Sequence, residues 1–99
     1  MVKVELHSRA RTEAGAAWRW YAKASQVVAS RFASAFADSI DAIQSNPAGQ
    51  APYIATTRIA RVKGFPYLLV FVVLASDLLQ VVAVAHTSRR PGYWRRRLP

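Results

Sequence analysis

The chain has 99 residues, a length that supports one domain around a single hydrophobic core, and we predict one domain over residues 1–99. Hydrophobic residues make up 53% of the sequence, including three Trp, four Tyr and four Phe, which excludes an intrinsically disordered chain. The absence of cysteine excludes disulfides, thiol nucleophiles and Cys-ligated metal sites, and it is typical of proteins of the reducing cytoplasm.

Positive charge is concentrated in the second half of the chain. Residues 1–49 carry six basic and four acidic residues, whereas residues 50–99 carry eight basic residues and one acid, Asp77. Eleven of the fourteen basic residues are Arg, whose planar guanidinium suits bidentate contact with phosphate or carboxylate. This asymmetry predicts a polyanionic partner: a nucleic acid, an acidic protein segment or an anionic membrane surface.

The sequence predicts neither export nor a membrane span. Glu5 and His7 precede any apolar stretch of signal-peptide length, so we expect a cytoplasmic protein. Residues 65–85 form an apolar run long enough to cross a bilayer, but Asp77 and Gln80 interrupt its middle. Because this run is also rich in Val, we interpret it as two buried strands.

Two helices are predicted after a short alternating strand at residues 2–6. Ser8 is the expected cap of the first helix and Ser25 of the second, and Asn46 and Pro47 end the second. Both helices show apolar side chains at helical spacing. The first stripe is Ala10, Ala14, Ala17, Trp18 and Tyr21, and the second is Val28, Phe32, Ala35, Phe36, Ile40 and Ile43.

Three further strands are predicted at residues 56–63, 67–74 and 78–85, with a loop at 47–52 before them and a hairpin turn at 75–77. The order is therefore β-α-α-β-β-β. This order predicts an α+β fold in which a helical hairpin packs on a small, mostly antiparallel sheet. A basic, aromatic tail occupies residues 86–99.

A phosphodiester-cleaving site would need cations, a base and an acid, and the second half offers candidates for it. They are Arg58, Arg61, Lys63, His86 and Tyr93. No carboxylate belongs to this set, because Asp77 is expected at a hairpin turn away from the basic residues. Nothing in the sequence matches a metal site, a phosphate-binding glycine loop or a cofactor motif, so we expect no metal and no cofactor.

Each candidate also has a purely structural interpretation. His86 can be satisfied by the backbone at the end of a strand, and Arg58 can pair with a carboxylate on the helices. Trp18, Trp20 and Tyr21 fit core and rim packing. Trp94 can close the open end of the core instead of stacking on a base, and residues 95–97 can be a solvated charge run.

Several of these residues carry a resemblance to a known family. Phe65, Pro66 and Tyr67 open a strand, Arg58 precedes them by seven residues, and a terminal pattern follows the last strand: His86, Arg89, Pro91, Tyr93 and Trp94. The chain resembles the RelE/ParE toxin superfamily, most closely its ParE-like, plasmid-stabilisation branch. Glu13, Ala17, Phe32 and Pro47 support the resemblance in the helical part.

The resemblance implies a toxin of a type II toxin–antitoxin system that forms a hetero-oligomer with a cognate antitoxin. RelE-like members cut mRNA in the ribosomal A site, whereas ParE-like members poison DNA gyrase. The carboxylate-poor basic half favours gyrase, with a ribosome-dependent mRNA endoribonuclease as the alternative and a general nucleic-acid or membrane-surface module third. Target or antitoxin contacts are expected from Arg58, Arg89, Arg90, Tyr93, Trp94, Arg95, Arg96 and Arg97.

Overall fold

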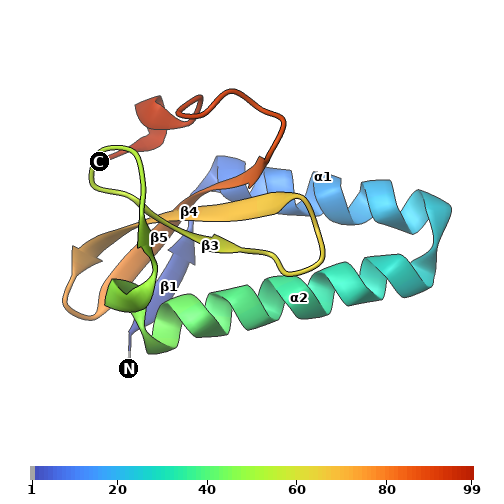
Figure 1. Cartoon of the computed structure of the whole chain (residues 1–99), viewed down its shortest axis with the longest axis horizontal. Coiled ribbons are helices and arrows are strands. Elements are labelled where there is room, and N and C mark those ends of the chain that lie inside the picture. Colours follow the sequence, from blue (N-terminus) through green and yellow to red (C-terminus); the bar gives the residue numbers. More distant parts are fainter. Residues whose placement is uncertain (1) are drawn as a thin grey trace.

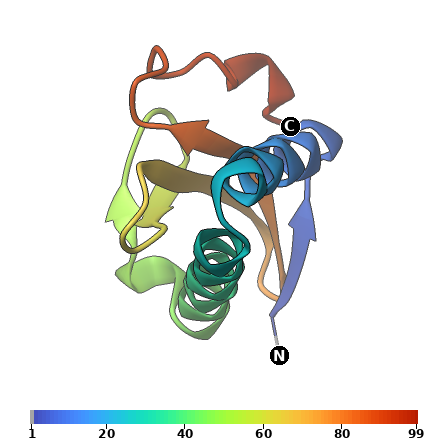
Figure 2. The ribbon, with the colours of Figure 1, turned by 90° about the vertical axis from the view of Figure 1, so that its right-hand side faces the viewer.

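A five-stranded sheet carries two helices on one face and the carboxy-terminal tail on the other (Figures 1 and 2). The computed structural model describes residues 2–99. Its elements are β1 (Lys3–Leu6), α1 (Ser8–Ala24), α2 (Gln26–Ser45), the 3₁₀ turn η1 (Pro47–Gly49), β2 (Ala51–Pro52), β3 (Arg58–Arg61), β4 (Tyr67–Ala75), β5 (Leu78–His86) and the 3₁₀ turn η2 (Arg95–Arg97).

The helix boundaries follow side-chain capping. Ser25 caps α2 as predicted, because its hydroxyl accepts a hydrogen bond from the Val28 amide at 3.2 Å. The predicted cap of α1 is wrong by one residue. His7 is the cap, since its ring Nδ1 accepts from the Arg9 amide at 3.1 Å, and Ser8 lies inside the first turn.

The strand order is β1-β5-β4-β3-β2, which confirms an α+β fold with a mostly antiparallel sheet. Only the β1–β5 pair is parallel, and the others are antiparallel. The apolar run at residues 65–85 contains β4 and all of β5 except its last residue, His86. No helix among residues 2–99 has the length and apolarity needed to span a membrane.

Two details of the sheet differ from the prediction. The segment 51–52, expected as loop, is the short edge strand β2, which pairs with β3 through Ala51–Ile59 and Pro52–Arg58. The predicted strand at 56–63 is also too long, because β3 spans only Arg58–Arg61. Ala55 adopts a positive φ of 55° just before it, so the chain turns there instead of extending.

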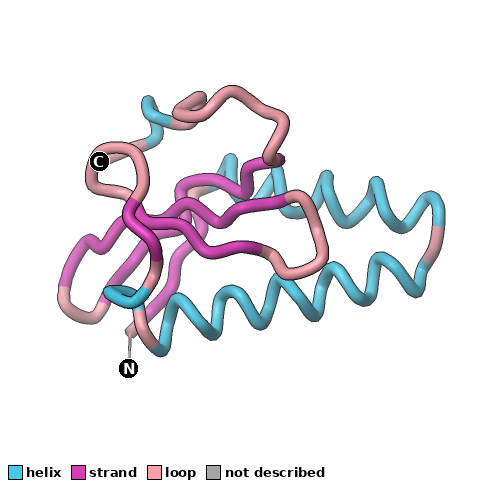
Figure 3. The backbone as a smooth tube through the Cα atoms, in the orientation of Figure 1, coloured by secondary structure: helices cyan, strands magenta, loops and turns pink. Residues whose placement is uncertain are grey.

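Each face of the sheet has its own apolar cluster. The helix face packs Leu69, Phe71 and Val81 against Phe32 and the other apolar side chains of the helices. The opposite face, here called the tail face, packs strand valines and alanines beneath Trp94, which is 1% exposed. Trp94 therefore closes the core, as one interpretation of the sequence expected. Figure 3 shows that the tail covering this face is loop apart from the single turn η2.

Candidate functional site

Glu13 on α1 lies at the centre of a polar cluster that joins this helix to the tail. Its carboxylate accepts hydrogen bonds from the Tyr93 hydroxyl at 2.6 Å and from Arg97 Nη1 and Nη2 at 2.8 and 3.1 Å. Arg89 Nη1 lies 3.6 Å from the same carboxylate. Three tail residues thus converge on one acid, and the fork of Arg97 meets both of its oxygens.

The same two side chains also satisfy the backbone of β5. Pairing of β1 with β5 ends at Leu6–Val81, so the next residues of β5 lack a neighbouring strand on that side. There, the Val84 amide donates to Glu13 Oε1 at 3.0 Å, and Arg97 Nη1 donates to the Val82 carbonyl at 3.0 Å. The Glu13–Arg97 ion pair therefore supplies the hydrogen bonds that a neighbouring strand would otherwise make to β5 at this edge.

A bulge in β5 accompanies this arrangement. Val70 pairs with Ala83 and Phe71 pairs with Val81, which leaves Val82 between them without a partner on β4. A bulge turns local backbone groups away from the regular ladder. The Val82 carbonyl is the one that receives Arg97.

Electrostatics fix the protonation of the cluster. Burial alone would raise the pKa of Glu13, but hydrogen bonds from Arg97, Tyr93 and the Val84 amide outweigh burial and lower that pKa below its usual value. Burial and the hydrogen bond to Glu13 raise the pKa of Tyr93. Near neutral pH, Glu13 is therefore ionised and Tyr93 is a protonated donor. Both groups are committed to structural contacts.

Cations stack on the Tyr93 ring. The Arg89 guanidinium carbon lies 3.8 Å from the ring centroid, and that of Arg97 lies 5.2 Å from it. The two arginines differ in exposure, since the Arg89 side chain is 55% exposed and that of Arg97 is 11% exposed. Of the predicted tail contacts, Arg97 and Trp94 are thus largely turned inward.

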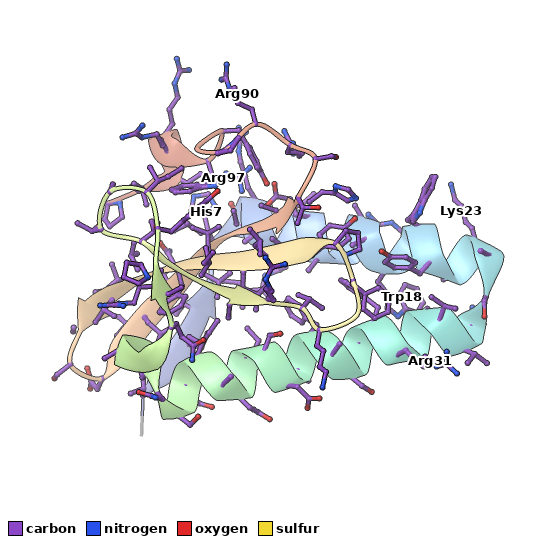
Figure 4. The ribbon with its side chains drawn as sticks, viewed as in Figure 1. His7, Trp18, Lys23, Arg31, Arg90 and Arg97 are labelled. Atoms are coloured by element: carbon purple, nitrogen blue, oxygen red, sulfur yellow. The ribbon has the colours of Figure 1, made fainter. Side chains whose placement is uncertain are left out.

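A basic cleft of about 730 Å³ lies between the start of α1 and the tail. Figure 4 shows Arg90 extending away from the ribbon at its rim. No acidic residue lines the cleft, which is bordered by His7, Arg9, Arg89, Arg90, Gly92, Tyr93, Arg95, Arg96 and Arg97.

The five residues considered for ribonuclease activity do not all gather at one place, although His86 and Tyr93 both line one small pocket. Strand alternation puts Arg61 on the tail face with Ile59, whereas His86 lies on the helix face beside Tyr67. Arg58 Nη1 donates to the Gln50 carbonyl at 2.7 Å instead of pairing with a carboxylate. Lys63 lies next to α2.

His86 is held by local contacts. Its Nδ1 accepts from the Ser88 amide at 3.0 Å and lies 2.7 Å from the Ser88 hydroxyl oxygen. Its ring stands edge-on to Tyr67 with the centroids 5.1 Å apart. These contacts agree with the interpretation of His86 as a histidine that closes a strand.

Glu13 is the site residue that residue-by-residue reasoning missed. The prediction that no carboxylate accompanies the basic residues is wrong, because Glu13 contacts Tyr93, Arg89 and Arg97. Its partners lie 71 to 84 residues away along the chain, beyond the reach of any local pattern. The available signal was its place in the family resemblance.

A second groove, of about 630 Å³, runs along α2 on the helix side of the molecule. Val27 in this groove is 61% exposed, and Trp18 and Trp20 on α1 are 40% and 69% exposed. The prediction that both tryptophans pack in the core or at its rim therefore overestimates their burial. We call the surface lined by Gln26, Val27, Ser30, Arg31, Ser34, Ala35, Asp38 and Lys63 the α2 groove.

Across residues 2–99, no three His, Asp or Glu side chains come together in a way that could hold a metal ion. No curated protein matches the chain closely enough to serve as a relative. A family model does match: residues 4–91 fit the model described as "ParE toxin of type II toxin-antitoxin system, parDE". The matched range covers both helices and nearly the whole sheet, and it includes Glu13, Val84 and Arg89, whereas Tyr93 and Arg97 lie beyond it. A match over this much of the sequence shows that the chain belongs to the ParE toxin family of type II toxin–antitoxin systems.

Proposed function

We propose that this toxin acts by inhibiting DNA gyrase and does not cleave RNA. Membership of the ParE family makes the chain the toxin of a type II toxin–antitoxin pair, with an antitoxin as its partner. Gyrase is the target that the ParE-like resemblance implies. The observation that carries the proposal is the division of the candidate catalytic side chains between two faces of the sheet.

General acid–base catalysis needs both groups within hydrogen-bonding reach of one substrate. His86 and Arg61 belong to β5 and β3, which are separated by β4, so their backbones lie roughly 10 Å apart at two strand spacings. Their side chains also point to opposite faces. One phosphodiester placed against His86 would be shielded from Arg61 by the sheet itself.

Tyr93 does not supply the missing acid. A raised pKa makes proton release harder, and its hydroxyl already donates to Glu13. Glu13 does not supply a base, because Arg97 covers both of its oxygens. Because neither Tyr93 nor Glu13 is free to transfer a proton, these contacts favour a toxin that acts by binding its target over one that cleaves RNA.

We further propose that the antitoxin covers the α2 groove and the target meets the tail. The α2 groove and the neighbouring helix surface carry exposed apolar side chains, the chemistry that an amphipathic antitoxin segment would bury. The exposed tail residues are cationic and remain candidates for target contact: Arg89, Arg90, Arg95 and Arg96.

The decisive experiment incubates the purified toxin with gyrase, relaxed plasmid and ATP. We expect less supercoiled product and an accumulation of linear plasmid after denaturation and proteolysis, the sign of trapped DNA breaks. A parallel translation reaction with ribosomes, read by primer extension, should show no new mRNA ends. Cleavage of mRNA in the A site at unchanged gyrase activity would contradict the proposal. Addition of the antitoxin should restore supercoiling.

A further inference from the structure

We infer that the basic cleft binds the phosphodiester backbone of a double-stranded nucleic acid. Four of its arginines have no carboxylate within ion-pair distance among the residues that the structure describes: Arg9, Arg90, Arg95 and Arg96. Glu13 lies against Arg97 and Arg89 instead. The cleft thus separates its inner, neutralised cations from an outer set that faces solvent.

Local structure explains how this outer set is presented. The turn η2 carries three consecutive arginines, and it points Arg97 inward to Glu13 while Arg95 and Arg96 stay exposed. Arg9 comes from the first turn of α1, which contains no acidic residue. The partial positive charge of that helix end is therefore not neutralised within its first turn and adds to the field of the arginines.

Phosphate is the anion that this geometry suits. Guanidinium groups bind phosphate oxygens bidentately, and several of them around one concave surface match a repeating line of phosphates. A double helix carries about one negative charge for each 1.7 Å of its axis, so a cleft with four free cations meets several phosphates at once.

The aromatic residues of the tail argue for a double strand over a single strand. Single-stranded nucleic acid is bound largely by stacking of its bases on exposed rings. Here the Tyr93 ring is covered by Arg89 at 3.8 Å and its hydroxyl donates to Glu13. Trp94 is 1% exposed beneath the tail. The cleft offers charge without a free stacking surface, which matches a paired helix whose bases are already stacked.

The lining also distinguishes a nucleic acid from an acidic protein segment. An amphipathic segment gains affinity from apolar anchors. The cleft contains no aliphatic side chain, whereas exposed apolar side chains such as Trp20, Val27 and Val73 lie outside it. A cleft whose lining is mainly cationic, and whose one aromatic ring is covered by Arg89, selects a uniformly charged polymer. This inference does not depend on gyrase, and it is tested without that enzyme.

The experiment measures fluorescence anisotropy of a short labelled duplex DNA with the full toxin chain. Salt is varied from about 50 to 200 mM, and four free arginines predict a slope of log K against log salt of about −3 to −4. Duplex RNA, single-stranded RNA and a polyglutamate peptide are measured alongside. Duplex DNA and duplex RNA should both bind, and their ratio identifies the preferred helix.

A double variant, Arg95→Gln with Arg96→Gln, should weaken duplex binding by at least about tenfold and reduce the salt slope by about 2. The matched control, Arg19→Gln with Lys23→Gln, removes the same charge from exposed positions on α1 that line neither the basic cleft nor the α2 groove, and it should change affinity less than about twofold. Circular dichroism confirms that both are folded. Equal losses in the two variants, or tighter binding of single-stranded RNA or polyglutamate than of either duplex, would overturn the inference.

Discussion

Glu13 accounts for both ion pairs found among residues 2–99. It also accepts hydrogen bonds from the Tyr93 hydroxyl and from the Val84 amide, so one carboxylate satisfies three kinds of donor: a guanidinium, a hydroxyl and a backbone amide. A half-buried acid in a chain of charge +9 is electrostatically favoured there, because its neighbours are cations. Glu13 therefore anchors the tail to α1, and the tail residues in turn surround its carboxylate.

Replacement of Glu13 by Ala should lower the free energy of unfolding by about 2–3 kcal/mol, because the Val84 amide loses its acceptor and the largely buried Arg97 loses its counterion. Urea unfolding followed by circular dichroism measures this change. Asp41→Asn is the matched control, since it removes one negative charge from an exposed position on α2 without an ion pair. An equal loss in both variants would show that net charge, and not the contacts of Glu13, is responsible.

The lowered pKa of Glu13 predicts acid sensitivity. A carboxylate whose pKa is lower in the folded state stabilises the fold above its unfolded pKa, near 4.5, and this contribution is lost as pH falls through the folded value. The free energy of unfolding should therefore drop below about pH 4.5. In Glu13→Gln that pH-dependent component should disappear, as urea titrations at a series of pH values would show. A variant with the same acid profile as the wild type would contradict this role.

Substitution of His86 distinguishes the two candidate functions, gyrase inhibition and RNA cleavage. If His86 only closes β5, then His86→Gln should remain toxic, because its contacts are to Tyr67 and Ser88 and not to other candidate catalytic groups. A ribonuclease would lose about 10²- to 10⁴-fold in activity with its acid or base. Growth curves after induction, with circular dichroism as a folding check, decide this. A folded but harmless variant would favour the ribonuclease.

At the level of elements, the tail from residue 87 onward has two roles. Arg97 anchors it to Glu13, and the exposed side chains of Arg95 and Arg96 form a surface that a partner can contact. Removal of residues 95–99 should weaken toxicity, but it also deletes Arg97 and leaves Glu13 without its strongest partner. We therefore expect the truncated chain to unfold at a lower temperature than the Arg95→Gln/Arg96→Gln variant. Thermal denaturation measures this difference.

Comparison of the toxicity of the truncated chain with that of the double variant then tests the contribution of the exposed arginines alone. The double variant retains Arg97 and Trp94, so a loss of growth arrest in a variant of wild-type stability assigns target contact to the exposed arginines. Antitoxin binding should be kept in the double variant, because the α2 groove contains neither residue. Full toxicity of both forms would contradict a role for this turn.

Sequence periodicity predicted the elements that bury a regular apolar stripe. The helices α1 and α2 and the long strands β4 and β5 follow this rule, and Trp94 was one correct option for closing the core. The strand β2 has two exposed residues and therefore no alternation to detect. The extent of β3 was overestimated because Thr56 and Thr57 favour strands, while the positive φ of Ala55 places them in a turn.

The candidate site was less predictable than the fold. Arg58, Arg61 and His86 were correctly placed on strands, but whether they share a face depends on the register of three strands and on the bulge at Val82. The Glu13 cluster depends on where β1 ends, because that end leaves the Val84 amide free. Strand register, bulge position and the end of a strand pair are set by tertiary structure, and local sequence patterns do not reveal them.

For the whole molecule, the two grooves lie on different surfaces and so allow separate partners. Val27→Ser should weaken antitoxin binding by about tenfold, since an exposed apolar contact of the α2 groove is lost. Titration calorimetry with the purified antitoxin measures this. The control is Val73→Ser, which changes a valine that is 57% exposed at the end of β4 and does not line the groove. Equal weakening in both would contradict this site.

The strand order has a consequence for self-association. One edge of the sheet is β2, which has two residues, and Pro52 has no amide hydrogen to donate to another strand. The other edge is β1, with four residues that include Lys3 and Glu5, and Gln44 of α2 already donates to the carbonyl of Val2 just before it. Short, charged and proline-containing edges resist strand addition. Edge-to-edge growth of this apolar sheet is therefore disfavoured at both edges. Contacts between copies of the chain are left to other surfaces, such as the helices, the tail and the exposed apolar residues Val73 and Leu74 near the end of β4.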